Sequence, residues 1–582
     1  METPSRPGIV VGAAPILRAL ADRIGLVAVI DDRVAWDPER CHLSPGERIL
    51  ALVLNLLTDR QPRYHVGDAF QLTDGPLLLG PGVTAEDWTD DAWGRALDKL
   101  AAAGPAAVFS AVAARAYAVE AIDRGGMHFD TTSRSLYGDD PTADGTHGVT
   151  PRYGHSQDHR DDWKQMLLTC FVNREGVPLM GTVEDGNRSD KRLNRQQIDR
   201  LVQAFSPEAL HDLVYIADSA LVTGPNLDAL AAIPLAWLSR LPDTFGVAAT
   251  AKAAAWAAAT WIPVGRVAQT PHAAPYAASE QTGTIGDRLY RLVVYRSSSL
   301  DRRKAKTLDR DLAQARATAE QAAAALSAQD FACAADAEAA ATTFAATAPR
   351  WWPCPTTVAP VTVTEKRPHP GRPRRDAPAP TRTIYRVTVA WGRRDDEAVR
   401  TELARRSTFV LITTLAADRY DAEALLREYK GQTRVEQRFH FLKDPAFVDA
   451  VFLQNPERIQ ALGYVMLLAL LLFSCLERRV RQAPESFPTA YRGRVARPTG
   501  HLILHHCRGI QVLWRDATHR YLAVPAAHRP AVRVILQALA LTETIYTLVE
   551  TFLSLDMMDD FRYPGENPPG GLPCRSLGRF PG

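Results

Sequence analysis

The chain has 582 residues, a hydrophobic content of 46%, a charged content of 23% and a formal net charge of +2 at pH 7. These values are typical of a globular protein with a sizeable core and enough length for three or four domains. They exclude nucleic-acid binding through a strong global field, so such binding would need local basic patches. The seven cysteines are scattered without a C-x-x-C pair, which favours a reducing compartment and argues against a disulfide framework or a thiolate zinc site.

No targeting or membrane segment is predicted. The start of the chain, residues 1–7, lacks a basic stretch followed by an apolar one. The uncharged run 461–476 has 16 residues, fewer than the ~20 that span a bilayer. We therefore expect a buried core helix there, and a cytoplasmic protein without a membrane partner.

Residues 1–115 are predicted to form a helical accessory domain. Ser44-Pro45-Gly46-Glu47 is typical of a helix start, with a capping serine and with proline at the first helical position. Gly104-Pro105 is expected to end a later helix. The residues of this domain do not indicate its role.

Residues 116–241 are predicted to form the first part of an α/β core. Apolar runs of strand length alternate with helical spacing, which favours a mixed sheet. Two of these runs end near an acid, Asp130 in 126–133 and Asp218 in 213–219. The remaining expected elements are strands at 165–172, 177–183 and 233–238 and helices at 196–205 and 226–232.

Residues 242–407 are predicted to be an insertion, because the strand pattern stops near 242 and resumes at 408–415. We expect within it a strand at 289–296, a long helical run at 301–348 and a strand at 383–391. Residues 366–406 contain 12 Lys and Arg against 5 Asp and Glu. Arg372, Arg374 and Arg375 flank Pro373 there, in a pattern that suits an arm in the minor groove of DNA; a solvated linker is an equal alternative.

Residues 408–480 are expected to complete the core, and 481–582 to form a C-terminal helical region with helices at 502–514 and 530–553. The breaker-rich end, 563–582, predicts disorder. The fold class is therefore α/β, with a core interrupted by a large α+β insertion and with helical N-terminal and C-terminal regions.

A third acid, Glu436, lies in a stretch with helical spacing. Tyr429, Gln432, Glu436 and Lys443 fall along one side if 429–443 is a single helix. An acid there would suit a metal ion, and the phenol and the ammonium would suit phosphate oxygens. The stretch alone is equally compatible with a solvated amphipathic helix.

Asp130, Asp218 and Glu436 together indicate metal chemistry. Carboxylates at buried strand ends are costly unless they are paired or metal-bound. Oxygen ligands without a cysteine pattern favour Mg²⁺ or Mn²⁺ over zinc. Two ions about 3.5–4 Å apart would support an in-line phosphoryl transfer.

The three segments that carry these acids resemble the DDE transposases of bacterial insertion sequences, in the group whose third acid lies in a Y-x2-R-x3-E-x6-K helix. The matching segments are 127–132, 215–220 and 429–443, and residues 183–190 resemble the stretch after the third core strand of that group. The likeness covers roughly 120–480, and residues 1–115 resemble the accessory domain of one subgroup.

The resemblance implies an RNase H-like core with a β-containing insertion before the third acid. It implies cut-and-paste transposition, in which the protein binds the terminal inverted repeats of double-stranded DNA, cleaves them and joins them to target DNA. Asp130, Asp218 and Glu436 would be the metal ligands for two Mg²⁺ or Mn²⁺ ions. Tyr429 and Lys443 match positions that contact phosphate.

One position departs from the pattern: Gln432 stands where the group has an arginine. Glutamine can donate a hydrogen bond to phosphate but carries no charge, which puts the phosphate clamp at this position in doubt. Lys191 and Arg192 follow the third strand and are further candidates for phosphate contacts, although ordinary surface basicity explains them equally well.

Other patterns have weaker interpretations. His155 and His159, and the cluster of His501, His505, His506 and Cys507, have spacings that suit a metal but lack a complete ligand set. Trp351-Trp352 would suit an unpaired base, although packed aromatics of the insertion are the favoured interpretation.

Three functions remain open: a transposase, an RNase H-fold nuclease that cuts without strand transfer, and a catalytically dead DNA-binding derivative. Because two DNA ends must meet, the first predicts a homodimer on DNA.

Overall fold

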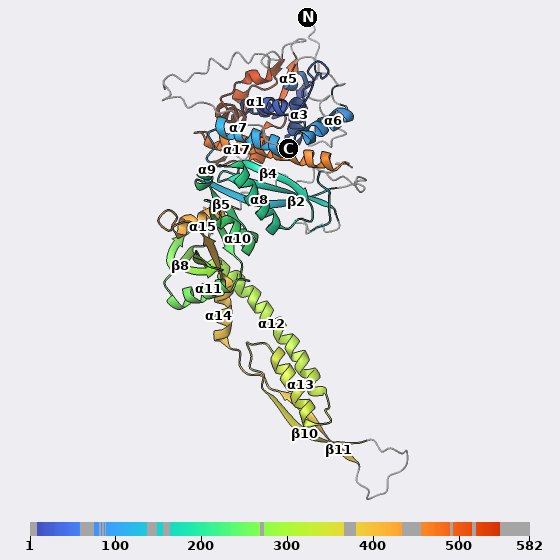
Figure 1. The fold of residues 1–582 in the computed structure, drawn as a ribbon, viewed down its shortest axis with the longest axis vertical. Helices are drawn as coiled ribbons and strands as arrows, with labels where there is room; N and C mark the ends of the chain where they lie inside the picture. The colour runs from blue at the N-terminus through green and yellow to red at the C-terminus, as the bar shows by residue number, and fades with distance from the viewer. Residues whose placement is uncertain are drawn as a thin grey trace, which may run out of the picture. The chain divides into compact units, whose positions relative to one another are not determined.

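The computed structural model describes residues 8–58, 75–80, 83, 87, 89–136, 148–154, 163–267, 273–365, 380–432, 455–488, 493–514 and 520–547. The chain divides into two compact units (Figure 1). The first unit consists of residues 1–121, 136–150 and 444–582, and the second of 122–135 and 151–443.

The first unit is mainly helical and joins the two ends of the chain. Its elements are β1 (Ile9–Val10), α1 (Ala14–Arg23), α2 (Leu26–Arg33), α3 (Pro45–Leu57), α5 (Gly75–Leu79), α6 (Asp90–Ala102), α7 (Pro105–Val119), α17 (Pro456–Gln482), β13 (Phe487–Pro488), β14 (Arg494–Val495), α18 (Gly500–Cys507), β15 (Gln511–Trp514), β16 (Arg520–Leu522), η5 (Ala526–His528), α19 (Pro530–Ala538) and η6 (Glu543–Tyr546). Helix α3 begins where predicted, with Ser44 as the capping residue. The Ser44 hydroxyl accepts from the Glu47 amide and the Glu47 carboxylate accepts from the Ser44 amide, both at 3.0 Å, which makes this start a capping box.

Helix α17 is the centre of the first unit. It packs against α3, α6 and α7. Among the described residues it is long and apolar enough to cross a membrane, as is the bent pair α6–α7 if counted as one span, but 94% of the most apolar window of α17 is buried. This burial agrees with the predicted core helix. A fully buried leucine such as Leu471 contributes about 1.5–3 kcal/mol to folding.

The C-terminal part of the first unit differs from the prediction. A helix was expected over 502–514, but α18 ends at Cys507 and 511–514 form the strand β15. Val512 pairs with Ile9 of β1 and with Leu522 of β16. The helix expected over 530–553 ends at Ala538, and residues 548–582 lie outside the described part.

The second unit is built on one large sheet. Its strands are β2 (Gly126–Ser135), β3 (Gln165–Asn173), β4 (Pro178–Asp185), β5 (Val214–Ala217), β6 (Ala236–Leu241), β7 (Ile262–Gly265), β8 (Tyr276–Ile285), β9 (Arg288–Ser297), β10 (Thr356–Thr364), β11 (Thr381–Val389) and β12 (Thr408–Thr413). Its helices are α8 (Asp190–Ala204), α9 (Pro207–His211), η3 (Ser219–Leu221), α10 (Gly224–Ala231), α11 (Gly246–Ala258), α12 (Ser298–Ala328), α13 (Ala334–Thr347), α14 (Asp396–Ser407) and α15 (Ala422–Lys430).

The large sheet has nine described strands in the order β4-β3-β2-β5-β6-β12-β9-β8-β7. Strand β3 pairs antiparallel with both β4 and β2, whereas β5 pairs parallel with both β2 and β6. Strand β5 is covered on both faces: the Tyr215 hydroxyl donates to Asn194 of α8 at 2.8 Å, and Ile216 packs with Leu425 of α15. This is the predicted α/β core, with an RNase H-like fold.

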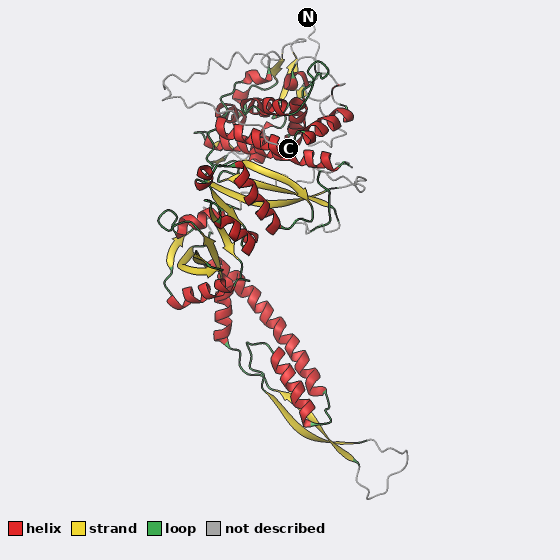
Figure 2. Cartoon of the chain, in the orientation of Figure 1, coloured by secondary structure: helices red, strands yellow, loops and turns green. Residues whose placement is uncertain are grey.

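The segment 242–407 has two parts. Strands β7, β8 and β9 continue the large sheet, because β9 pairs with β12. The rest forms an arm in which α12 and α13 lie beside the ribbon of β10 and β11 (Figure 2). The long helical run expected over 301–348 is interrupted, since Phe331 between the two helices makes a bridge with Tyr385.

Tryptophans 351 and 352 are part of the packing of this arm. The Arg350 guanidinium lies 5.2 Å from the Trp351 ring centroid. Arg316 lies 5.4 Å from the centroid of Trp352 and 3.7 Å from that of Trp391. These cation–π contacts agree with the packed-aromatic interpretation of the pair.

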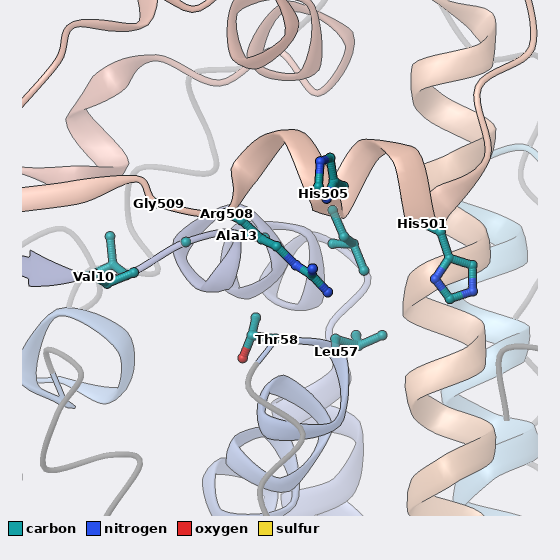
Figure 3. Close-up of a pocket in the computed structure, with 11 residues that line it drawn as sticks. Val10, Ala13, Leu57, Thr58, His501, His505, Arg508 and Gly509 are labelled. Atoms are coloured by element: carbon teal, nitrogen blue, oxygen red, sulfur yellow. The ribbon is translucent and has the colours of Figure 1, made fainter. Parts of the chain in front are cut away.

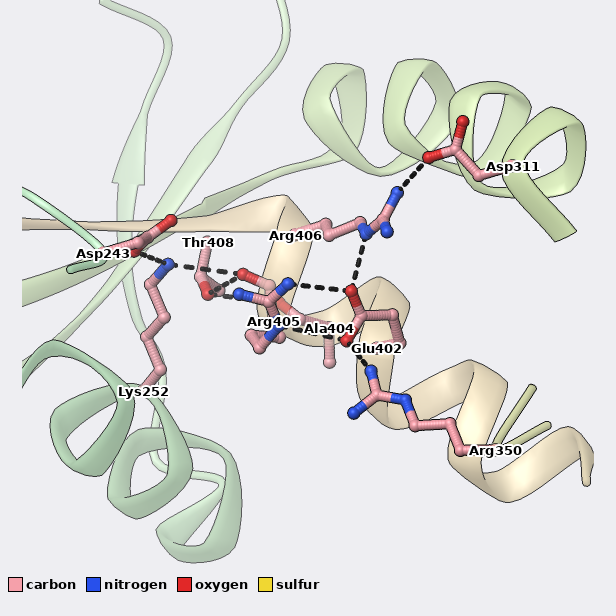
Figure 4. A network of polar contacts seen from close by, with 9 residues as sticks. All are labelled: Asp243, Lys252, Asp311, Arg350, Glu402, Ala404, Arg405, Arg406 and Thr408. Carbon is pink, nitrogen blue, oxygen red and sulfur yellow. Dashed lines mark hydrogen bonds and ion pairs between the residues drawn. The ribbon is translucent and has the colours of Figure 1, made fainter. Parts of the chain in front are cut away.

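An ion network fastens the base of the arm (Figure 4). Glu402 of α14 is 4% exposed and contacts Arg350, Arg405 and Arg406. Arg406 also contacts Asp311 of α12 at 2.6 Å. The outgoing helix α12 and the returning helix α14 are therefore tied together just before β12 re-enters the sheet.

Candidate active site

The pairing of β2 with β5 brings two of the predicted acids together. Met127 pairs with Tyr215 and His128 with Ile216, so each partner lies 88 residues further along the chain. The same offset, continued past the last pair, sets Asp130 level with Asp218. Asp218 keeps extended backbone angles (φ −70°, ψ −177°), so the continuation follows the strand direction.

Asp218 caps the short helix η3. Its carboxylate accepts from the Ala220 amide at 3.0 Å, and its carbonyl accepts from the Ser239 hydroxyl at 2.7 Å. Burial raises the pKa of Asp218 above its ordinary value, and the negative charge of Asp190 raises it further. A half-buried carboxylate beside a second one attracts a cation.

Asp190 is a carboxylate of this region that the sequence reasoning did not single out. It is the first residue of α8, and its Oδ1 accepts from the Thr131 hydroxyl of β2 at 2.8 Å. It therefore joins α8 to the strand that carries Asp130. An acid at a helix start is common for electrostatic reasons alone, so only its place as the last residue of the resembling segment 183–190 could have pointed to it.

A cavity of about 550 Å³ lies beside these groups. Its lining includes Thr131 and Ser133 of β2, residues 186–189, Asp190 and Lys191 at the start of α8, and Ala220. Lys191 is among the lining residues, whereas Arg192 is exposed on α8 and does not line the cavity. Lys191 therefore lies beside Asp190, whereas Asp130 and Asp218 are not among the residues that line the cavity.

The end of α15 lies against β2. Gly431 follows the helix, and a Cβ added there would lie 2.9 Å from Cε1 of His128. His128 and Asp130 are two residues apart and point to the same face of the strand. The chain therefore leaves α15 on the face of the sheet that carries Asp130.

Two contacts from the β3–β4 turn hold α15 in place. The guanidinium of Arg174 contacts Glu428 at 2.8 Å and donates to the Tyr420 hydroxyl at 3.1 Å. Because Glu428 lies in the last turn of α15, this pair fixes the helix end that leads to Glu436.

Helix α15 ends at Lys430, and Gly431 and Gln432 form a turn. Residues 433–443, the larger part of the helix expected over 429–443, lie outside the described part of the chain. The close approach of Gly431 to His128 and the low helix propensity of glycine explain the end of α15. Tyr429 packs against the core, and Gln432 is 8% exposed.

Several predicted residues lie outside the described part of the chain. These are Glu436, Lys443, Arg372, Arg374, Arg375, His155 and His159. Within the described residues, no group of three or more His, Cys, Asp and Glu side chains that could hold a metal is found. In the other predicted cluster, burial raises the pKa of Cys507 to about 12, so its thiol stays protonated at neutral pH.

Comparisons with known proteins agree with this architecture. Residues 10–114 match the model of a domain of unknown function (DUF4277). A search of curated proteins gave no match. Residues 140–472, more than half of the chain, match the model of the transposase DDE domain. The chain therefore belongs to the DDE transposases and carries an additional N-terminal domain.

Proposed function

We propose that the protein binds the terminal inverted repeats of its insertion sequence, cleaves the DNA and transfers the cut strands to target DNA. The observation that carries the proposal is the parallel pairing of β2 with β5, which sets Asp130 level with Asp218. Membership of the transposase family supports the same reaction class.

Glu436 is proposed as the third acid. Gly431 lies against His128, close to Asp130. Five residues lead from Gly431 to Glu436, and a chain of this length reaches at most about 17 Å. The carboxylate of Glu436 is thus within reach of the aspartate pair.

The donor set suits hard divalent cations. Asp130 and Asp218 offer only oxygen ligands, and the neighbouring Asp190 adds negative charge, which suits Mg²⁺ or Mn²⁺. When bound, two such ions would activate the attacking water or 3′-hydroxyl and stabilise the leaving oxygen. Asp130, Asp218 and Glu436 would hold them.

The other residues of the site position these acids and the DNA. Asp190, held by the Thr131 hydroxyl, keeps α8 against β2. Lys191 at the cavity is proposed to contact a DNA phosphate. Tyr429, Gln432, Lys443 and Arg192 are proposed as further contacts, as are the arginines of the arm, Arg372, Arg374 and Arg375.

Strand transfer with a labelled DNA end tests the proposal. A duplex of the element's own end would be incubated with the protein, Mg²⁺ and a target plasmid, with Asp130→Ala, Asp218→Ala and Glu436→Gln run in parallel. We expect cleaved and joined product with the wild type and neither product with any of the three variants. Cleavage by a variant that lacks one of the acids would show that this acid is not part of the active site.

Two alternatives give different results in the same assay. Cleavage without joined product would identify a nuclease of the same fold. DNA binding without cleavage would identify a catalytically dead derivative. For the transposase we propose a homodimer on the DNA and a cytoplasmic location, with sedimentation of the protein with and without the end duplex as the test of the dimer.

A further inference from the structure

A second cavity, of about 510 Å³, lies in the first unit (Figure 3). The aspartate pair belongs to the second unit. Its walls come from both ends of the protein: Gly12 and Ala13 precede α1, Thr58 follows α3, and Arg508 follows α18. The volume lies within the range of about 300–1,000 Å³ that is usual for small-molecule sites.

Basic side chains from the α18 segment line this cavity. His501, His505 and Arg508 are separated by four and three residues, which places them along one side of the helix. Figure 3 shows the guanidinium of Arg508 extending from the end of α18 toward Leu57 and Thr58. The segment thus presents one permanent cation and two imidazoles to the cavity.

Helix α18 is held firmly enough to fix these groups. The Gly500 amide donates to the carboxylate of Glu477 in α17 at 2.7 Å. A Cβ added to Gly500 would lie 2.3 Å from the Phe473 ring, so the helix start lies directly on α17. The T-shaped contact of His501 with Phe473, at 5.5 Å, adds to this packing.

The cavity is electropositive. Among the described residues, no hydrogen bond or ion pair is formed by the side chain of Arg508. A second guanidinium stands at the edge, where Arg529 donates to the carbonyl of Gly509 at 3.0 Å, and Gly509 lines the cavity. Residues 493–547 contain seven arginines and two acids, and of these acids Glu543 accepts from the Ala526 amide.

The walls also have an apolar side. Val10, Val11, Leu57 and Leu504 line the cavity together with the cations. A phosphodiester with its deoxyribose offers a matching pair of surfaces, a charged phosphate and an apolar sugar edge. Guanidinium groups bind phosphate oxygens with short, charge-assisted hydrogen bonds.

We propose that this cavity binds a backbone phosphate of the DNA, with Arg508 as the main contact and His501 and His505 as supporting donors. The proposal rests on the proposed function and adds to it a DNA contact on the unit that contains the N-terminal domain. It predicts binding without base preference, because phosphate contacts carry no sequence information.

Salt-dependent DNA binding tests this contact. The affinity of the full chain for the end duplex would be measured by fluorescence anisotropy from 50 to 200 mM salt, with Arg508→Gln as the variant. Arg33→Gln is the matched control, since Arg33 is an exposed arginine on α2 of the same unit. We expect Arg508→Gln to bind about tenfold more weakly at low salt. The negative slope of log affinity against log salt should become shallower by about 0.9, the value for one lost phosphate contact.

A second experiment distinguishes DNA from free phosphate as the ligand of the cavity. Thermal unfolding of both variants and of the wild type would be followed with and without 10 mM orthophosphate, which also confirms that the variants fold. A wild type that does not bind the duplex would count against the proposed function. Equal affinity and equal salt slope for Arg508→Gln and Arg33→Gln would overturn the phosphate contact alone. Stabilisation by orthophosphate that depends on Arg508, with unchanged DNA affinity, would also overturn it.

Discussion

Replacing Glu402 by glutamine tests whether the ion network of Figure 4 fastens the arm to the sheet. The Glu402 carboxylate contacts Arg350 and Arg406 at 2.6 Å and Arg405 at 2.8 Å. Hydrogen bonds from Arg405, with those from Arg406, lower the pKa of Glu402 from 4.5 to about 2. Glutamine keeps the shape of the side chain and removes the charge.

The magnitude follows from the pKa. A lowering from 4.5 to about 2 corresponds to about 3 kcal/mol of stabilisation of the charged form. Because Arg350 and Arg405 are at least half exposed, solvent screening reduces this to about 2 kcal/mol. The folded-state pKa is lowered, so the stabilisation is complete above the unfolded value of 4.5 and is lost as the pH falls toward 2.

Amide hydrogen exchange measures this effect locally. At pH 7 we expect exchange in α14 and β12 to be about 30-fold faster in Glu402→Gln than in the wild type, which is the ratio that about 2 kcal/mol gives. The ratio of the exchange rates of Glu402→Gln and the wild type should be the same at pH 5 and should decrease below pH 4.5. Glu338→Gln, an exposed glutamate of the same arm, should leave exchange unchanged. Exchange that is equal in all three proteins at pH 7 would refute the argument.

Three further predictions concern the core and the site. Leu471→Ala should lower the unfolding free energy by about 2–5 kcal/mol in urea denaturation, because the residue is fully buried in α17; a loss below 1 kcal/mol would contradict a packed core there. Gly431→Val should reduce DNA cleavage at least tenfold with folding retained, because the added atoms displace the end of α15 from β2. Cleavage at the wild-type rate would show that this contact does not position the active site. Asp190→Asn should lower the pKa of Asp218 by removing a negative charge and so move the acid limb of the cleavage profile to lower pH, whereas Asp199→Asn on the same helix should not.

The sequence was most informative where a local pattern decides the structure. The apolar runs that end near Asp130 and Asp218 form neighbouring parallel strands, as buried strands of an α/β core do. The uncharged run inside α17 forms a buried helix, because α3, α6 and α7 pack around it.

The patterns failed where distant residues decide the outcome. Residues 511–514 have helical spacing but form a strand, because Ile9, far away in the sequence, pairs with Val512. Strands β7–β9 join the large sheet through β12. The sequence did not indicate this, because the alternation of strands and helices stops near residue 242. Asp190 owes its place to a hydrogen bond from Thr131, and no spacing within α8 indicates that bond.

The central claim is that Asp130 and Asp218 share one metal site. Titration of Mn²⁺ into the wild type, Asp130→Asn, Asp218→Asn and the double variant, followed by electron paramagnetic resonance, tests it directly. We predict that each single variant weakens the same site at least tenfold and that the double variant is little worse than either one, because the two ligands act together. Independent, additive losses from the two variants, or binding that neither variant changes, would contradict the claim.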